Sequence, residues 1–145
     1  MKIVYLLFFI LITGCMTGST VYEPEGPYKV TKVLDGDTLD VNNGERIRLI
    51  GINTPEKNEC YYKEATEELK KLTEGKVILL EIDNADKDKY GRLLRVVYVK
   101  GINVNSHMIE KGFARVFDEF PSLDYNSLKQ LEKIAKEKNL GLWNC

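Results

Sequence analysis

Three short stretches of this sequence hold the residue types that phosphate chemistry requires. The candidate residues are Asp37, Arg48, Asn53, Thr54, Glu56 and Arg92. Phosphoryl transfer needs oxygen ligands for a hard divalent cation, a group that activates water, and cations that stabilise the negative charge of the transition state. Because these residues supply all three kinds of group, together they indicate a site for phosphoryl transfer.

The candidate cation ligands are oxygen donors of three kinds. Asp37 supplies an anionic oxygen, Asn53 a side-chain carbonyl and Thr54 a backbone carbonyl. With water, these oxygens could fill the roughly six to eight ligand positions that Ca²⁺ accepts. The sequence therefore predicts one bound divalent cation, with Ca²⁺ as the expected ion.

Water activation and charge stabilisation are assigned to the other candidates. Glu56 lies two residues beyond Thr54, where its carboxylate can hold or deprotonate the attacking water. Arg48 and Arg92 carry planar guanidinium groups that can each grip two phosphate oxygens. Taken singly, residues 35–38 are also typical of a hairpin turn, residues 51–56 of a strand exit and residues 88–92 of a polar loop. The functional prediction therefore depends on their combination.

Short strands and helices must position these side chains. The dipeptides Asp35-Gly36 and Asn43-Gly44 are favoured hairpin turns, and they separate three strand-like runs. The expected strands span 28–34, 38–42, 45–52, 77–82 and 93–99, with a polar stretch over 83–92, and the expected helices span 60–74, 103–111 and 124–139. In the third strand Arg48 alternates with apolar neighbours, so we expect it on the face away from them.

The order of these elements predicts the fold class. Five strands, of which the first three form a meander, with a helix between the third and fourth, fit an oligonucleotide-binding barrel. The expected fold is therefore α+β, a closed five-stranded OB-fold β-barrel with about three α-helices.

Length and charge limit the other possibilities. The chain has 145 residues, 43% of them hydrophobic, which is enough for the core of one domain. Its 21 basic and 22 acidic residues nearly balance, so no global positive field draws it onto nucleic acid. Any contact with DNA or RNA must be local, and we expect a monomer.

The N-terminal residues indicate export from the cytoplasm. Residues 1–15 resemble a lipoprotein signal peptide, whose apolar run is too short to span a bilayer and whose end resembles a lipobox that places the lipid on Cys15. An ordinary secretory signal is the alternative. We expect a lipid-anchored protein outside the cytoplasm, with a flexible tether over 16–27 and a folded domain over 28–145.

Two cysteines remain once Cys15 is assigned to the lipid. Cys60 and Cys145 would lie in an oxidising compartment, where two thiols can pair. Two independent buried thiols are the alternative, because sequence does not show whether the sites are close.

Four motifs closely resemble those of the staphylococcal (micrococcal) nuclease family. They are Asp-Gly-Asp-Thr at 35–38, Arg-Leu-Ile-Gly-Ile-Asn-Thr-Pro-Glu at 48–56, Asp-Lys-Tyr-Gly-Arg at 88–92 and Gly-Leu-Trp at 141–143. Their order and spacing extend the resemblance over about 30–143. It implies a Ca²⁺-dependent enzyme that hydrolyses DNA and RNA with little sequence preference and leaves 3′-phosphates.

The resemblance also assigns a role to each candidate residue. The expected Ca²⁺ ligands are Asp37, Asn53 and Thr54. The expected catalytic residues are Arg48, Glu56 and Arg92, and the expected nucleotide-pocket residues are Lys89 and Tyr90.

Two departures from the family pattern keep alternatives open. Asn53 stands where the best-studied members carry aspartate, which lowers the expected cation affinity. Residues 117–120 lack the family's nucleotide-stacking tyrosines and include two acids. A second hypothesis is therefore a non-catalytic OB-fold module that binds single-stranded nucleic acid or a protein partner. A third is a structural module tethered to the cell envelope.

Overall fold

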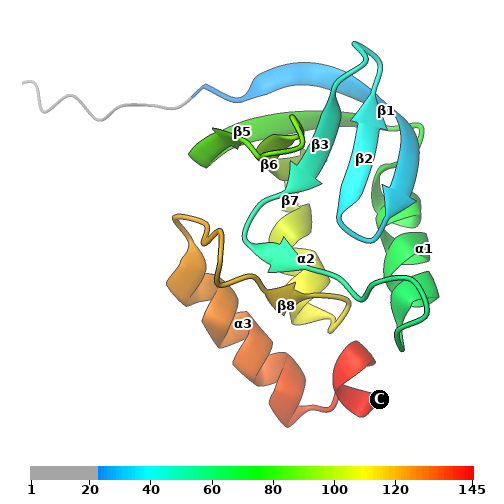
Figure 1. Cartoon of the computed structure of the whole chain (residues 1–145), viewed down its shortest axis with the longest axis vertical. Helices are drawn as coiled ribbons and strands as arrows, with labels where there is room; N and C mark the ends of the chain where they lie inside the picture. The colour runs from blue at the N-terminus through cyan, green and yellow to red at the C-terminus, as the bar shows by residue number, and fades with distance from the viewer. Residues whose placement is uncertain (1–22) are drawn as a thin grey trace, which may run out of the picture.

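A strongly curved β-sheet forms one half of the molecule and helices cover the other half (Figure 1). The computed structural model describes residues 23–145. The strands are β1 (Glu25–Asp35), β2 (Thr38–Val41), β3 (Arg46–Leu49), β4 (Ile52–Asn53), β5 (Val77–Lys87), β6 (Leu93–Val99), β7 (Ile102–Asn103) and β8 (Arg115–Val116). The helices are α1 (Tyr62–Thr73), α2 (Val104–Glu110), α3 (Tyr125–Glu137) and the 3₁₀ helix η1 (Gly141–Asn144).

Five of the strands close into a barrel. The main sheet has the order β3-β2-β1-β5-β6-β7, and a parallel pairing of β3 with β6 joins its two sides. Leu39, Ile47 and Leu49 are fully buried inside it, because alternate side chains of each strand point inward. The expected five-stranded OB-fold barrel with three α-helices is therefore confirmed.

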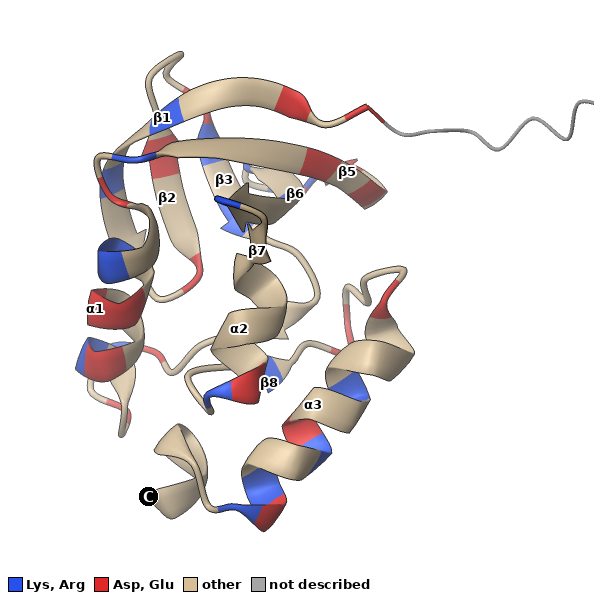
Figure 2. Ribbon diagram, turned by 180° about the vertical axis from the view of Figure 1, so that it is seen from behind, with Lys and Arg blue, Asp and Glu red and all other residues tan. Residues whose placement is uncertain are grey.

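The helices present charge of both signs to solvent. Figure 2 shows basic and acidic segments interspersed along α1 and α3. Within residues 23–145, no helix is both long enough and apolar enough to cross a bilayer. Residues 1–15, with the expected lipid site at Cys15, and residues 16–22 of the expected tether lie outside the described part of the chain.

Two strand boundaries differ from the expectation. β1 begins at Glu25 rather than Tyr28, and β5 continues to Lys87 through the stretch expected to be a polar connection. The cause is Arg95 on β6, which is 2% exposed and donates to Glu25 Oε2 and Asp86 Oδ1 at 2.7 Å each. Because a buried guanidinium needs such partners, these polar residues belong to the sheet.

The expected strand over 45–52 is interrupted. Gly51 has φ +75°, and the chain turns there before β4 pairs with β8 in a separate small sheet. A Cβ at this position would lie 2.7 Å from the Ser122 Cβ, so both the conformation and the space require glycine. This turn leads to Asn53 and Glu56, which line the cleft described below.

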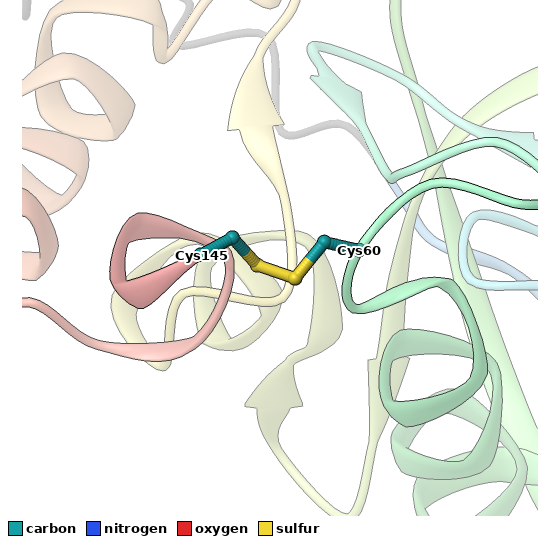
Figure 3. The surroundings of a disulfide bond; sticks show 2 residues. All are labelled: Cys60 and Cys145. Atoms are coloured by element: carbon teal, nitrogen blue, oxygen red, sulfur yellow. A yellow bond between two sulfur atoms is a disulfide. The ribbon is translucent and has the colours of Figure 1, made fainter.

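A disulfide joins Cys60 to Cys145 and ties the C-terminal η1 to the segment that leads into α1 (Figure 3). The two residues are 85 positions apart in the chain.

We expect the double variant Cys60→Ser/Cys145→Ser to lose roughly 4 kcal/mol of unfolding free energy, because a long loop is released in the unfolded chain. Urea unfolding measures this loss. A reductant should destabilise the wild type and leave the double variant unchanged, whereas equal stability of both proteins would contradict the prediction.

Candidate active site

A cleft of about 500 Å³ opens at one side of the barrel. It lies where the β1–β2 turn, the end of β3 and the β5–β6 loop meet the segment that follows β8. The predicted residues that line it are Asp37, Arg48, Asn53, Glu56, Lys89, Tyr90 and Arg92. The other predicted residue, Thr54, lies behind Asp37 and contacts it. The structure thus brings the candidates together, and their individual roles remain predictions.

Arg48 is held rigidly in the wall of the cleft. It is 8% exposed, less than a side chain displayed on a free strand face. Its Nη1 donates to the carbonyl oxygens of Leu49 and Ile52 at 2.6 and 2.8 Å, and its Nη2 donates to Asn53 Oδ1 at 2.9 Å. The turn after β3 therefore fixes the guanidinium plane.

Asp37 is the counterion of Arg48. Its Oδ1 lies 3.1 Å from Arg48 Nε and accepts the Thr38 hydroxyl at 3.0 Å. Its Oδ2 accepts both the backbone N–H and the hydroxyl of Thr54 at 3.0 Å each. Since a carboxylate offers about four lone-pair positions, a cation that binds Asp37 must displace one of these contacts.

Arg92 is positioned by its own loop. Asp88 accepts from the backbone N–H groups of Tyr90 and Arg92 at 2.9 and 3.1 Å, and from Arg92 Nε at 2.7 Å. Burial works to raise the pKa of Asp88, but these donors outweigh it and hold the pKa below its usual value. Arg92 therefore faces a carboxylate whose ionised form is favoured, and its remaining nitrogens have no side-chain acceptor among residues 23–145.

A second acid, Asp35, also lines the cleft. Burial and the neighbouring charge of Asp37 raise the pKa of the Asp35 carboxyl. The repeated Asp of Asp-Gly-Asp was the signal for this residue, because acids two positions apart across a tight turn are brought together. The sequence patterns above place Asp35 only in the hairpin turn.

The donor chemistry fits a hard cation. Asp35, Asp37 and Glu56 line the cleft, and Ca²⁺ prefers carboxylate oxygens as ligands. Within residues 23–145, however, no group of three or more His, Cys, Asp or Glu side chains is placed to hold a metal ion. A cation here could be held by the paired aspartates, with neutral oxygens and water completing its shell.

The opposite wall comes from the segment after β8. Phe117 lies with its ring centroid 6.0 Å from Arg48 Cζ and 5.9 Å from the Phe120 ring. Asp83 holds this segment, since it accepts from the Leu123 N–H at 2.8 Å and the Ser122 hydroxyl at 2.5 Å. The sequence around Phe117 does not predict this contact, because nothing local shows that the segment returns to Arg48.

Comparison with known proteins identifies the family of this chain. A family model described as "Staphylococcal nuclease homologue" matches residues 46–145. An uncharacterised endonuclease of Escherichia coli O157:H7 is 37% identical over 123 residues, covering 80% of this chain and 76% of that protein. A thermonuclease of Staphylococcus intermedius is 36% identical over 126 residues, covering 80% and 75%. The chain therefore belongs to the staphylococcal nuclease family of phosphodiester hydrolases.

Proposed function

We propose that this protein is a Ca²⁺-dependent nuclease that cleaves DNA or RNA with little sequence preference and leaves 3′-phosphates. We further propose that it acts as a monomer outside the cytoplasm, anchored by a lipid on Cys15. The observation that supports the nuclease proposal best is the convergence of Arg48, Arg92, Asp37 and Glu56 on one cleft. The carboxylate proposed to activate water and the two guanidinium groups proposed to bind the phosphate thus line the same cleft.

In the proposed reaction, water attacks the phosphorus atom and the bond to the 5′-oxygen breaks. Glu56 takes the proton from the attacking water, and the leaving oxygen gains a proton from solvent. Arg48 and Arg92 bind the non-bridging oxygens, whose negative charge grows in the transition state. A bound Ca²⁺ would supply positive charge that polarises the phosphate and orients the water.

The fixed geometry of Arg48 supports this role. Backbone carbonyls, Asn53 and Asp37 already orient its guanidinium, so little reorganisation is required when charge develops on the phosphate. Because the net charge of the whole chain is close to zero, we expect the arginines of this cleft to provide the attraction for the substrate phosphates.

Digestion of labelled DNA and RNA by the fragment that begins at Met16 tests the proposal. We expect cleavage that rises through about 10⁻⁴ to 10⁻³ M calcium, the range of weak extracellular sites, and that stops when a chelator is added. Nucleic acid that stays intact across a millimolar calcium titration would rule out the nuclease.

Asn53 favours the second candidate, a non-catalytic binder, because it removes a charge from the cation site. Its Oδ1 accepts from Arg48 at 2.9 Å, and an aspartate could keep this contact while adding a negative charge. We therefore expect Asn53→Asp to lower the calcium concentration needed for half-maximal cleavage. Asn43→Asp, in the exposed turn between β2 and β3, is the matched control. A pure binder would gain no cleavage from either change.

A further inference from the structure

A second, smaller hollow adjoins the active-site cleft at Tyr90 and Arg92. This second hollow, of about 290 Å³, lies between the β2–β3 hairpin and the β5–β6 loop. Its lining residues are Asp40, Gly44, Arg46, Tyr90, Gly91 and Arg92. Because Tyr90 and Arg92 also line the active-site cleft, the two hollows adjoin at these residues.

Arg46 and Arg48 lie on the same face of β3. The residue between them, Ile47, is fully buried in the core, so the two arginines alternate with it and share the other face. Two residues of strand advance by roughly 6.5 to 7 Å. That step is close to the distance between neighbouring phosphates of one extended polynucleotide strand.

The guanidinium of Arg46 is oriented by Asp40 and still has a free donor nitrogen among the described residues. Its Nε and Nη2 donate to the two carboxylate oxygens of Asp40 at 2.7 and 3.0 Å. This hydrogen bonding with Arg46 keeps the pKa of Asp40 below its usual value. Among residues 23–145, Nη1 has no acceptor, and 49% of the side chain is exposed. Asp40 therefore fixes the fork and leaves one edge of it for a ligand.

No side chain projects into the hollow from the tip of the β2–β3 hairpin. Gly44 forms part of its wall, and a Cβ built there would meet no atom within 4 Å. Tyr90, which is 72% exposed, stands between the two hollows with Arg92 Cζ 5.5 Å from its ring centroid. Arg46 and Arg92 thus flank a space that is open to solvent.

We propose that Arg46 binds a second phosphate of the substrate, next to the one that Arg48 and Arg92 hold. This inference rests on the proposed nuclease function and defines its substrate class more narrowly. The favoured substrate is a polynucleotide with at least one phosphate beyond the scissile one, rather than a dinucleotide with a single phosphodiester.

Steady-state kinetics with two substrates test this subsite. For an oligonucleotide of about ten residues, we expect Arg46→Ala to raise KM about three- to tenfold with kcat within about twofold, and to reduce the salt dependence of binding by about one ion. For a dinucleotide with one phosphodiester, KM should not change. Asp40→Asn is the matched control, because it removes the negative charge but keeps the guanidinium and an amide oxygen that can still accept from it, so KM should stay the same or fall.

Three results would overturn the subsite. They are an unchanged KM for the oligonucleotide in Arg46→Ala, an equal rise in KM for the dinucleotide, and a rise in KM in Asp40→Asn as large as that in Arg46→Ala.

Failure of the nuclease proposal looks different, because the wild type would then cleave neither substrate. In that case fluorescence anisotropy with a labelled phosphorothioate oligonucleotide decides the matter without turnover, and equal affinity of wild type and Arg46→Ala would exclude the contact.

Discussion

Arg48→Ala is expected to lower kcat/KM for DNA by about 10²- to 10³-fold, the usual effect of removing one preorganised donor to the transition state. The guanidinium is fixed by two carbonyl oxygens, Asn53 and Asp37, so no other side chain can take its place without rearranging the cleft. Initial rates on a fluorescent oligonucleotide at saturating calcium measure the loss.

Two further variants show whether the loss belongs to the site. Arg115→Ala removes an exposed arginine of β8 that does not line the cleft, and it should retain activity within about twofold of the wild type. Arg48→Lys keeps the charge but not the planar fork, and it should stay strongly impaired. Full activity of folded Arg48→Ala, checked by circular dichroism, would remove Arg48 from the mechanism.

Glu56→Gln is expected to lower kcat by about 10²- to 10⁴-fold, since an amide of the same shape cannot accept the proton of the attacking water. The segment that carries this residue is fixed, because the Glu56 N–H donates to Glu59 Oε2 at 2.7 Å. Single-turnover cleavage at saturating enzyme and calcium isolates the chemical step from binding.

The control for this variant is Glu64→Gln. Glu64 is an exposed acid in the first turn of α1 and lies outside the cleft, so the Glu64→Gln variant should have the activity of the wild type. Equal single-turnover rates for Glu56→Gln and wild type would show that another group activates the water.

Local sequence was sufficient for those parts of the site that are built locally. The loop from Asp88 to Arg92 is held by hydrogen bonds between residues at most four positions apart. The conformation of this loop can therefore be predicted from its own sequence motif. Arg48 could be placed because strand alternation separates it from Ile47 and Leu49. Its near-complete burial was not foreseen, because it depends on the turn at Gly51 and on residues of other elements.

The missed features all depend on long-range contacts. Arg95 reaches Glu25 across 70 positions of sequence, and this pair extends the sheet beyond the limits set by apolar alternation. Phe117 comes to Arg48 only because β8 pairs with β4. Charged ends of strands and two-residue strands carry no periodic signal, so patterns of hydrophobicity could not reveal them.

Digestion in water enriched in ¹⁸O tests most directly whether this cleft hydrolyses phosphodiesters. A defined DNA oligonucleotide is incubated with the Met16 fragment and calcium, and the products are weighed by mass spectrometry. We predict one ¹⁸O atom in each new 3′-phosphate, with both cleavage and label lost in Arg48→Ala and Glu56→Gln. Intact DNA, or cleavage that leaves the new phosphate unlabelled, would contradict the assignment.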